Sequence, residues 1–377
     1  MSVESPALPA RLPHLPRVQL LRGVAALLVL LAHLAVVEGK YSPDRLLGDW
    51  AAFGFAGVDL FFVISGFIMV YVTWGGRGGA RESGRFLWRR ATRIYPLYWA
   101  VSAAVLVVWL LRPAMVFGSN PDPDILRSFL LLPDEHLPLL SVGWTLIYEM
   151  YFYLVFALAL LLPARWRILA LVAWAVVAQA VPAPEGSPTL AVMLSPLVRE
   201  FLFGALVAWT ALTLFVLDPV LGGRAPVLAG RRWGVVAAAA LLGLGLWSLF
   251  GGGVPDAVAV ARDHGWRAEA WGLPAAALLV LTLLSPFGRL PLGDWLGDIS
   301  YSLYLTHVLT LSLLGRLWAP WARDGVWDNA VMLAVLVAGS VAVAAAAYYA
   351  VERPLIRWFR RRRAPRVPSG ASEPASR

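Results

Sequence analysis

The sequence contains no cysteine and few charged residues. Of its 377 residues, 15% are charged, and 32 basic residues outnumber 23 acidic ones. Without cysteine, the chain cannot form a disulfide, use a thiol nucleophile or bind a metal through thiolates. It is instead 59% hydrophobic, with a mean hydropathy of +0.69. A soluble core cannot absorb that much apolar sequence, so we predict an all-α protein that crosses a membrane several times.

Windows of about 20 apolar residues, each long enough to cross a bilayer as a helix, recur along the chain. They predict a bundle of about ten transmembrane helices. Two longer connections, 113–142 and 251–270, are expected to form short lids over an outward-facing opening. The predicted spans are roughly 18–37, 53–74, 95–112, 143–162, 166–182, 193–217, 233–250, 271–287, 298–317 and 329–352.

The distribution of arginine predicts the orientation of the bundle. If the N-terminus is cytoplasmic, arginines concentrate in inside segments such as 75–94, whereas outside loops carry only scattered cations such as Lys40 and Arg267. This bias fits the positive-inside rule, with both termini in the cytoplasm. The net charge of +9 therefore indicates membrane topology and not nucleic-acid binding. We expect a cytoplasmic N-terminal segment (1–17), a transmembrane domain (18–358) and a basic, disordered cytoplasmic tail (359–377).

Two polar residues interrupt the first apolar segment. Arg22 and His33 are eleven residues apart, so a helix would place them on one face, roughly 16 Å apart along its axis. Burying such groups in a bilayer is costly, which makes both of them candidates for function. Arg22 would lie near one membrane surface and His33 deep in the span. The pair predicts a site that accepts an anion from one side and carries out proton chemistry further in.

Asp59 opens the second predicted span at about the depth expected for His33. A carboxylate bonded to one imidazole nitrogen would fix the tautomer of the ring and make it a better base. The alternative is that Asp59 caps or snorkels at a helix end. Ser65, in the same span, is more simply explained as a packing residue than as a nucleophile.

Glu149 is an acid inside the fourth predicted span, with no cation near it in sequence. It therefore needs a partner from another span, and Arg199 near the outer end of the sixth span is a candidate. The spacing leaves two roles open, a structural Glu–Arg pair and a catalytic acid. Trp144 precedes Glu149 in the same segment.

Arg90 and Arg93 end the first long inside loop. Three residues apart on a helix, they would share one face, and their guanidinium forks could clamp phosphate oxygens. The alternative is that they only set the topology. Arg22 would emerge at the same membrane surface, which favours an anion site.

The ninth predicted span carries a polar stripe. Ser300, Tyr304 and His307 follow the spacing i, i+4, i+7 on an otherwise apolar helix. A single buried histidine is more often a hydrogen-bonded core residue. Three polar residues on one face are better explained as the lining of a cavity.

Taken together, these segments resemble acyltransferase family 3, which includes bacterial O-acetyltransferases of lipopolysaccharide, exopolysaccharide and nodulation factors. The segment from Arg22 to His33 is similar to the family's Arg-x10-His motif, and Arg90-Ala-Thr-Arg93 to its Arg-x-x-Arg motif. The resemblance runs from about residue 18 to 358. Further similar blocks are Gly57–Phe67, Trp144–Glu149, Ser300–His307 and Val351–Pro354.

The resemblance implies transfer of an acyl group, usually acetyl, from cytoplasmic acyl-coenzyme A to a hydroxyl, often on an exported glycan, at a bacterial inner membrane. We expect acetyl-coenzyme A as donor, no metal, a carbohydrate or glycolipid acceptor, contact with membrane lipids and, if the product is handed over, a separate periplasmic partner. An acyl-histidine intermediate is the alternative to general-base catalysis. The candidate catalytic residues are His33, Asp59 and Glu149, those for coenzyme A are Arg22, Arg90 and Arg93, and those for substrate are Trp144, Tyr304 and His307.

Two other classes of protein compete with this interpretation. Intramembrane arginine, histidine and glutamate are equally suited to a proton-coupled transporter or flippase for an anionic or glycolipid substrate. The sequence shows no inverted repeat and no matching pair of broken spans, which such a transporter would favour. A non-catalytic scaffold would leave Arg22 and His33 without a role. Hydrolysis of acyl-coenzyme A by the purified protein would distinguish an enzyme from a transporter.

Overall fold

The computed structural model describes residues 15–116, 123–182, 185–220, 234–245, 267–285 and 289–361. All of the regular secondary structure in these ranges is helical. The main helices are α1 (Pro16–Tyr41), α2 (Ala56–Thr73), α3 (Ala80–Leu111), α6 (Gly143–Ala159), α7 (Ala164–Ala180), α9 (Val198–Val220), α13 (Leu273–Leu284), α14 (Pro291–Trp318) and α15 (Val326–Ala347). Shorter elements are η1 (Asp49–Phe55), α4 (Pro113–Val116), α5 (Ile125–Leu130), α8 (Pro188–Met193), a helix over Gly234–Gly245, the π-helices η2 (Ala268–Gly272) and η4 (Tyr348–Glu352), η3 (Ala319–Trp321) and α16 (Arg353–Arg361).

Each of the ten predicted spans overlaps a helix in the described part of the chain. This confirms the prediction of an all-helical membrane protein, while the count of ten crossings and the side of the termini stay predictions. Shorter apolar helices cover Gly143–Ala159, Gly234–Gly245 and Ala268–Leu284. Within the described residues, five stretches are long and apolar enough to cross a membrane, namely Pro16–Tyr41, Asp49–Thr73, Ala80–Leu111, Pro188–Thr213 and Val326–Phe359.

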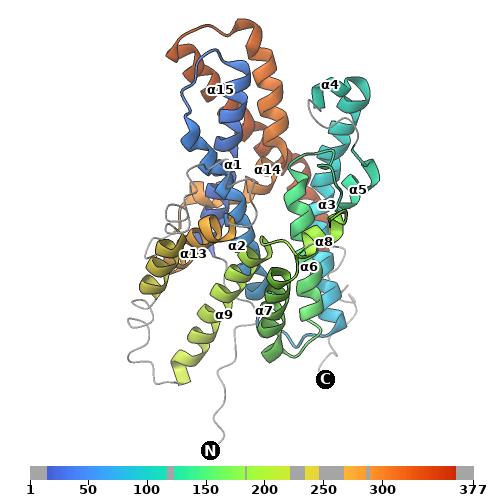
Figure 1. Cartoon of the computed structure of the whole chain (residues 1–377), viewed down its shortest axis with the longest axis vertical. Helices are drawn as coiled ribbons and strands as arrows, with labels where there is room; N and C mark the ends of the chain where they lie inside the picture. Colours follow the sequence, from blue (N-terminus) through green and yellow to red (C-terminus); the bar gives the residue numbers. More distant parts are fainter. Residues whose placement is uncertain are drawn as a thin grey trace, which may run out of the picture.

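Helices α1 and α14 run parallel and in close contact (Figure 1). Near the start of both helices, a Cβ atom on Gly297 would lie 2.2 Å from the backbone oxygen of Gln19. Near their ends, a Cβ atom on Gly315 would lie 2.6 Å from the ring of Tyr41. A side chain at either glycine would push the helices apart. This close approach sets the middle of α1 against the middle of α14.

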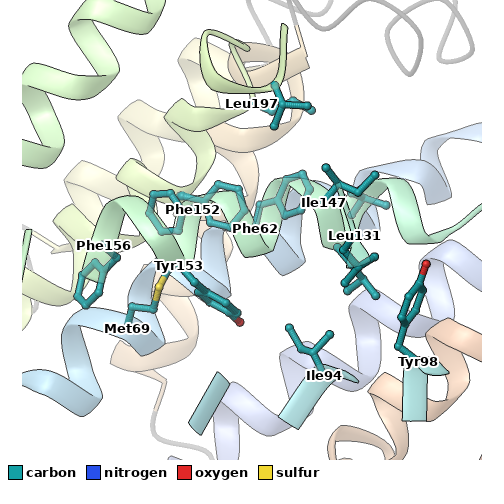
Figure 2. Packing of buried hydrophobic residues seen from close by; sticks show 14 of the residues in the cluster. Phe62, Met69, Ile94, Tyr98, Leu131, Ile147, Phe152, Tyr153, Phe156 and Leu197 are labelled. Atoms are coloured by element: carbon teal, nitrogen blue, oxygen red, sulfur yellow. The ribbon is translucent and has the colours of Figure 1, made fainter. Parts of the chain in front are cut away.

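Aromatic side chains join α2, α6 and α9 in the largest buried cluster. The ring of Phe201 is stacked between those of Phe62 and Phe152, at centroid distances of 4.6 and 4.1 Å. Figure 2 shows Phe62 and Phe152 in one row with Ile147. Lipid tails are as apolar as these side chains, so tight van der Waals packing is what holds such helices together.

One of the two predicted connections differs from expectation. Residues 267–270 were expected in an outside loop, but Arg267 is 2% exposed and η2 is buried within the bundle. The bundle holds them because Arg267 has a buried carboxylate partner, described below. Residues 133–138 of the other connection line a cavity, as a lid would. Residues 117–122 and 251–266 of these segments lie outside the described residues, as do 1–14 and 362–377.

The contact between α2 and α9 generates a stability prediction. A Cβ atom on Gly204 would lie 1.8 Å from the backbone oxygen of Val63, and one on Gly66 would lie 1.9 Å from that of Phe201. Gly204→Ala should therefore force the helices apart and destabilise the protein by about 2 kcal/mol. The measurement is the apparent unfolding temperature in detergent, followed by tryptophan fluorescence. Gly84→Ala in α3 is the control, because no atom lies within 4 Å of its Cβ position. Equal unfolding temperatures for both variants would contradict the packing described here.

Candidate active site

Three arginines from two helices converge on one cavity of about 210 Å³. Arg22 comes from α1, and Arg90 and Arg93 come from α3. Glu149 of α6 and Tyr304 of α14 line the same space, which we call the arginine cavity. Residues from separate sequence motifs, predicted only to emerge at the same membrane surface, thus line one cavity.

The arginines differ in their partners. Arg93 pairs with Glu352, with 3.1 Å between Nη1 and Oε1. Arg22 donates a 2.8 Å hydrogen bond to Gln19, and the Arg90 guanidinium lies 5.3 Å from the centre of the Tyr153 ring. Among the described residues, neither Arg22 nor Arg90 has a carboxylate within 4 Å. The cavity therefore presents cationic donors that an anion can engage.

Glu149 has hydroxyl partners in place of the predicted arginine. Its Oε1 accepts hydrogen bonds from Ser65 Oγ at 3.1 Å and from the Tyr153 hydroxyl at 2.5 Å. Arg199, the predicted partner, pairs with Glu269 instead. The pairing predicted from the sequence was therefore wrong, because Ser65 and Tyr153 already supply donors to the glutamate. Ser65 acts here as a hydrogen-bond donor.

His33 lines a second, larger cavity of about 1140 Å³. Arg267, Trp144 and Tyr148 also line this space, which we call the histidine cavity. Its volume lies slightly above the roughly 300–1,000 Å³ that ligand pockets usually occupy. The Nδ1 atom of His33 lies 2.9 Å from the backbone oxygen of Val29 and 3.3 Å from Nε2 of His307.

Asp59 does not contact His33, which corrects the predicted carboxylate–imidazole pair. Its two oxygens accept bonds from Nε and Nη2 of Arg267, at 2.8 and 2.9 Å. Asp59 is fully buried and Arg267 is 2% exposed. A planar guanidinium matches both oxygens of a carboxylate at once, so it satisfies the buried charge better than one ring nitrogen would.

Sequence reasoning missed Arg267, which it treated as a scattered loop cation. The guanidinium lies close to two indole rings, 5.7 Å from the centre of Trp144 and 5.3 Å from that of Trp271. The sequence did hold one signal, because Arg267 and Trp271 are four residues apart and a helix brings such residues together. Of these three groups, Arg267 and Trp144 line the histidine cavity.

The two cavities share part of their lining at Tyr304 and Val58. The Tyr304 hydroxyl lies 2.6 Å from Oγ1 of Thr145 and 3.1 Å from the backbone oxygen of Val142. The ring of Phe61 packs edge-on against Tyr304, with 5.8 Å between centroids. Tyr304 and Val58 therefore lie where the two cavities adjoin, and we call this boundary the partition.

The predicted polar stripe on α14 divides into three different roles. Tyr304 lines both cavities, whereas the buried ring of His307 contacts His33. Ser300 Oγ donates to the backbone oxygen of Gly297 at 2.7 Å and so bonds within its own helix. Only Tyr304 of the three lines the two cavities described here, so the stripe is not a simple cavity lining.

The chain matches known proteins over most of its length. The model of a family described as an acyltransferase domain matches residues 15–349. The exopolysaccharide production protein ExoZ of Rhizobium meliloti (strain 1021) is 33% identical over 334 residues, which cover 84% of this chain and 94% of ExoZ. The acyltransferase MdmB of Streptomyces mycarofaciens is 28% identical, covering 94% of this chain and 95% of MdmB. No solved structure gives a significant match.

The buried Asp59–Arg267 pair predicts that removing the arginine destabilises the protein more than removing the aspartate. Glu200, also fully buried, interacts electrostatically with both members of the pair. Arg267→Leu would leave Asp59 without its ion-pair partner and Glu200 with Arg199 as its nearby cation, whereas Asp59→Leu would leave Arg267 with Glu200. We expect Arg267→Leu to destabilise the protein by about 3–5 kcal/mol, and Asp59→Leu to cost less. The measurement is chemical or thermal unfolding of both variants and of the double variant. A double variant less stable than Arg267→Leu would contradict the pairing.

Proposed function

This chain belongs to acyltransferase family 3, and we propose that it transfers an acetyl group from acetyl-coenzyme A to a hydroxyl of a cell-surface or exported glycan. The observation that carries the proposal is a histidine cavity that adjoins a cavity of cationic arginines across Tyr304. The name of the relative ExoZ, an exopolysaccharide production protein, supports a glycan acceptor. A bacterial inner membrane, with both termini in the cytoplasm, is the location we propose.

The arginine cavity is the proposed site for the phosphates of the donor. Arg22 and Arg90 would bind phosphate oxygens directly, because neither is neutralised by a carboxylate within 4 Å in the described chain. The flexible pantetheine arm would then span the roughly 16 Å of helix rise between Arg22 and His33. This places the thioester at the partition formed around Tyr304.

The histidine cavity is the proposed site for the acceptor. Aromatic faces at Trp144 and Tyr148, next to the polar group of Arg267, combine apolar surface with a few directed polar groups, as small-molecule sites generally do. The acceptor hydroxyl would lie against His33. Glycan and donor would thus approach the partition from different cavities.

The proposed reaction balances with His33 alone as the proton carrier. His33 takes the proton of the acceptor hydroxyl as the hydroxyl oxygen attacks the thioester carbonyl carbon. The tetrahedral intermediate collapses, the carbon–sulfur bond breaks, and the coenzyme A thiolate takes the proton back from the imidazolium. Tyr304 would position the acyl group, and Glu149 would orient Ser65 and Tyr153 on the donor side. Attack by His33 itself would differ by leaving an acyl-histidine, which acid quenching and mass spectrometry would detect.

The role of His33 makes a direct prediction. General-base catalysis contributes on the order of 10²–10⁴-fold to a rate. His33→Ala should therefore lower the rate of acetyl transfer by about that factor while the protein stays folded. The measurement is release of free coenzyme A thiol by purified protein with a glycan acceptor, beside the unfolding temperature of each variant. Wild-type turnover in a folded His33→Ala variant would overturn the assignment.

The donor site makes a second prediction. Acetyl-coenzyme A should raise the unfolding temperature of the wild-type protein, because a ligand that binds only the folded state stabilises it. Arg90→Ala/Arg93→Ala should abolish this stabilisation. Arg85→Ala/Arg89→Ala is the matched control, since it removes two exposed arginines from the same helix outside the cavity lining. Equal stabilisation of both double variants would place the phosphates elsewhere.

A further inference from the structure

The rings of His33 and His307 meet edge to face inside the bundle. Their centroids are 4.7 Å apart, and their planes are inclined by 77°. Nδ1 of His33 lies 3.3 Å from Nε2 of His307, and His307 is 1% exposed. Two imidazolium rings at this distance would repel each other, so at most one of them carries a charge.

The surroundings of His307 determine which of its nitrogens holds the proton. Its Nδ1 lies 2.7 Å from the backbone oxygen of Tyr304 and 3.1 Å from that of Leu303. Carbonyl oxygens only accept hydrogen bonds, so Nδ1 must be the donor. In the neutral ring, Nε2 then carries the lone pair and can only accept. The nitrogen of His307 that faces His33 is therefore an acceptor.

The same reasoning then determines the tautomer of His33. Both partners of its Nδ1 are acceptors, namely the backbone oxygen of Val29 at 2.9 Å and Nε2 of His307. His33 Nδ1 must therefore carry a proton that is shared between them. The lone pair of the neutral ring is left on Nε2, which has no hydrogen-bond partner among the described residues of this chain.

We propose that His307 is a positioning residue, which holds His33 in the Nδ1–H tautomer so that Nε2 is the base in the histidine cavity. This inference rests on the proposed function of His33 and extends it. His307 would do what a buried carboxylate does in a Ser-His-Asp triad, where the third group orients the imidazole and stabilises its charged form. After His33 Nε2 takes a proton, its Nδ1–H still donates to the neutral His307. His307 itself neither gains nor loses a proton.

This arrangement explains how His33 can act as a base without a hydrogen bond to Asp59. Asp59 is already engaged by both arms of the Arg267 guanidinium. A neutral imidazole bonded to two backbone oxygens supplies an acceptor without adding a further charge to the membrane interior. It also agrees with the high cost of burying an unpaired carboxylate there.

Steady-state kinetics test the positioning role. His307→Leu removes the acceptor, and we expect it to lower kcat by about 10-fold or more while the KM for acetyl-coenzyme A stays unchanged, because only the base is misoriented. His307→Gln keeps an acceptor oxygen and should recover most of the lost rate. Thr310→Val is the matched control, since it is a buried substitution one turn further along α14.

The tautomer itself is measured by ¹⁵N NMR of the full-length protein labelled at its five histidines, with the His33 signals identified by their loss in His33→Gln. The expected wild-type signature is a protonated Nδ1 and an unprotonated Nε2 on His33. A protonated Nε2, or wild-type kcat in His307→Leu, would overturn the proposal, and the wild-type spectrum decides the matter even if His307→Leu does not fold.

If His33→Ala is inactive and His307→Leu is fully active, only this inference fails. If His33→Ala is active, the proposed function fails as well.

Discussion

The close, parallel contact of α1 with α14 is the constraint on which the rest of the site depends. It is possible because Gly297 lets the backbone oxygen of Gln19 approach where a side chain would stand. Because the two helices keep the same register along their length, the ring of His33 meets that of His307. Helix α1, which carries His33, also carries Arg22 into the arginine cavity, about 16 Å from His33 along the axis. One helix therefore contributes to both cavities, and its partner α14 contributes the Tyr304 that lies between them.

The second organising principle is the cost of charge in a membrane interior. Asp59 with Arg267, and Arg93 with Glu352, are held as ion pairs. Glu149 is satisfied by two hydroxyl groups. Against this background, Arg22 and Arg90 stand out within the described chain, because their guanidinium groups face a cavity and have no carboxylate within 4 Å. Charges retained at such a cost are expected to serve a substrate.

The sequence predicted what depends on local periodicity and hydropathy. The helical fold follows from apolar windows, and the shared face of Arg22 and His33 follows from 3.6 residues per turn. The partners of the buried charges could not be predicted in this way. Arg267 and Asp59 are 208 residues apart in the chain, and His307 and His33 are 274 apart. Which of several buried polar groups becomes a partner depends on how helices distant in sequence pack together. That is why sequence position offered Asp59 as a candidate partner of His33, and Arg199 as a candidate partner of Glu149, and the structure pairs neither.

The account holds that donor and acceptor occupy two adjoining cavities that meet at Tyr304, with the donor phosphates on the arginines. The most direct test is a cryo-EM map of the protein bound to a thioether analogue of acetyl-coenzyme A, which cannot be cleaved. We predict density for the pyrophosphate against Arg22 and Arg90, with the acyl end extended toward Tyr304 and His33. Density for the pyrophosphate in the histidine cavity, or no contact with these arginines, would contradict the account.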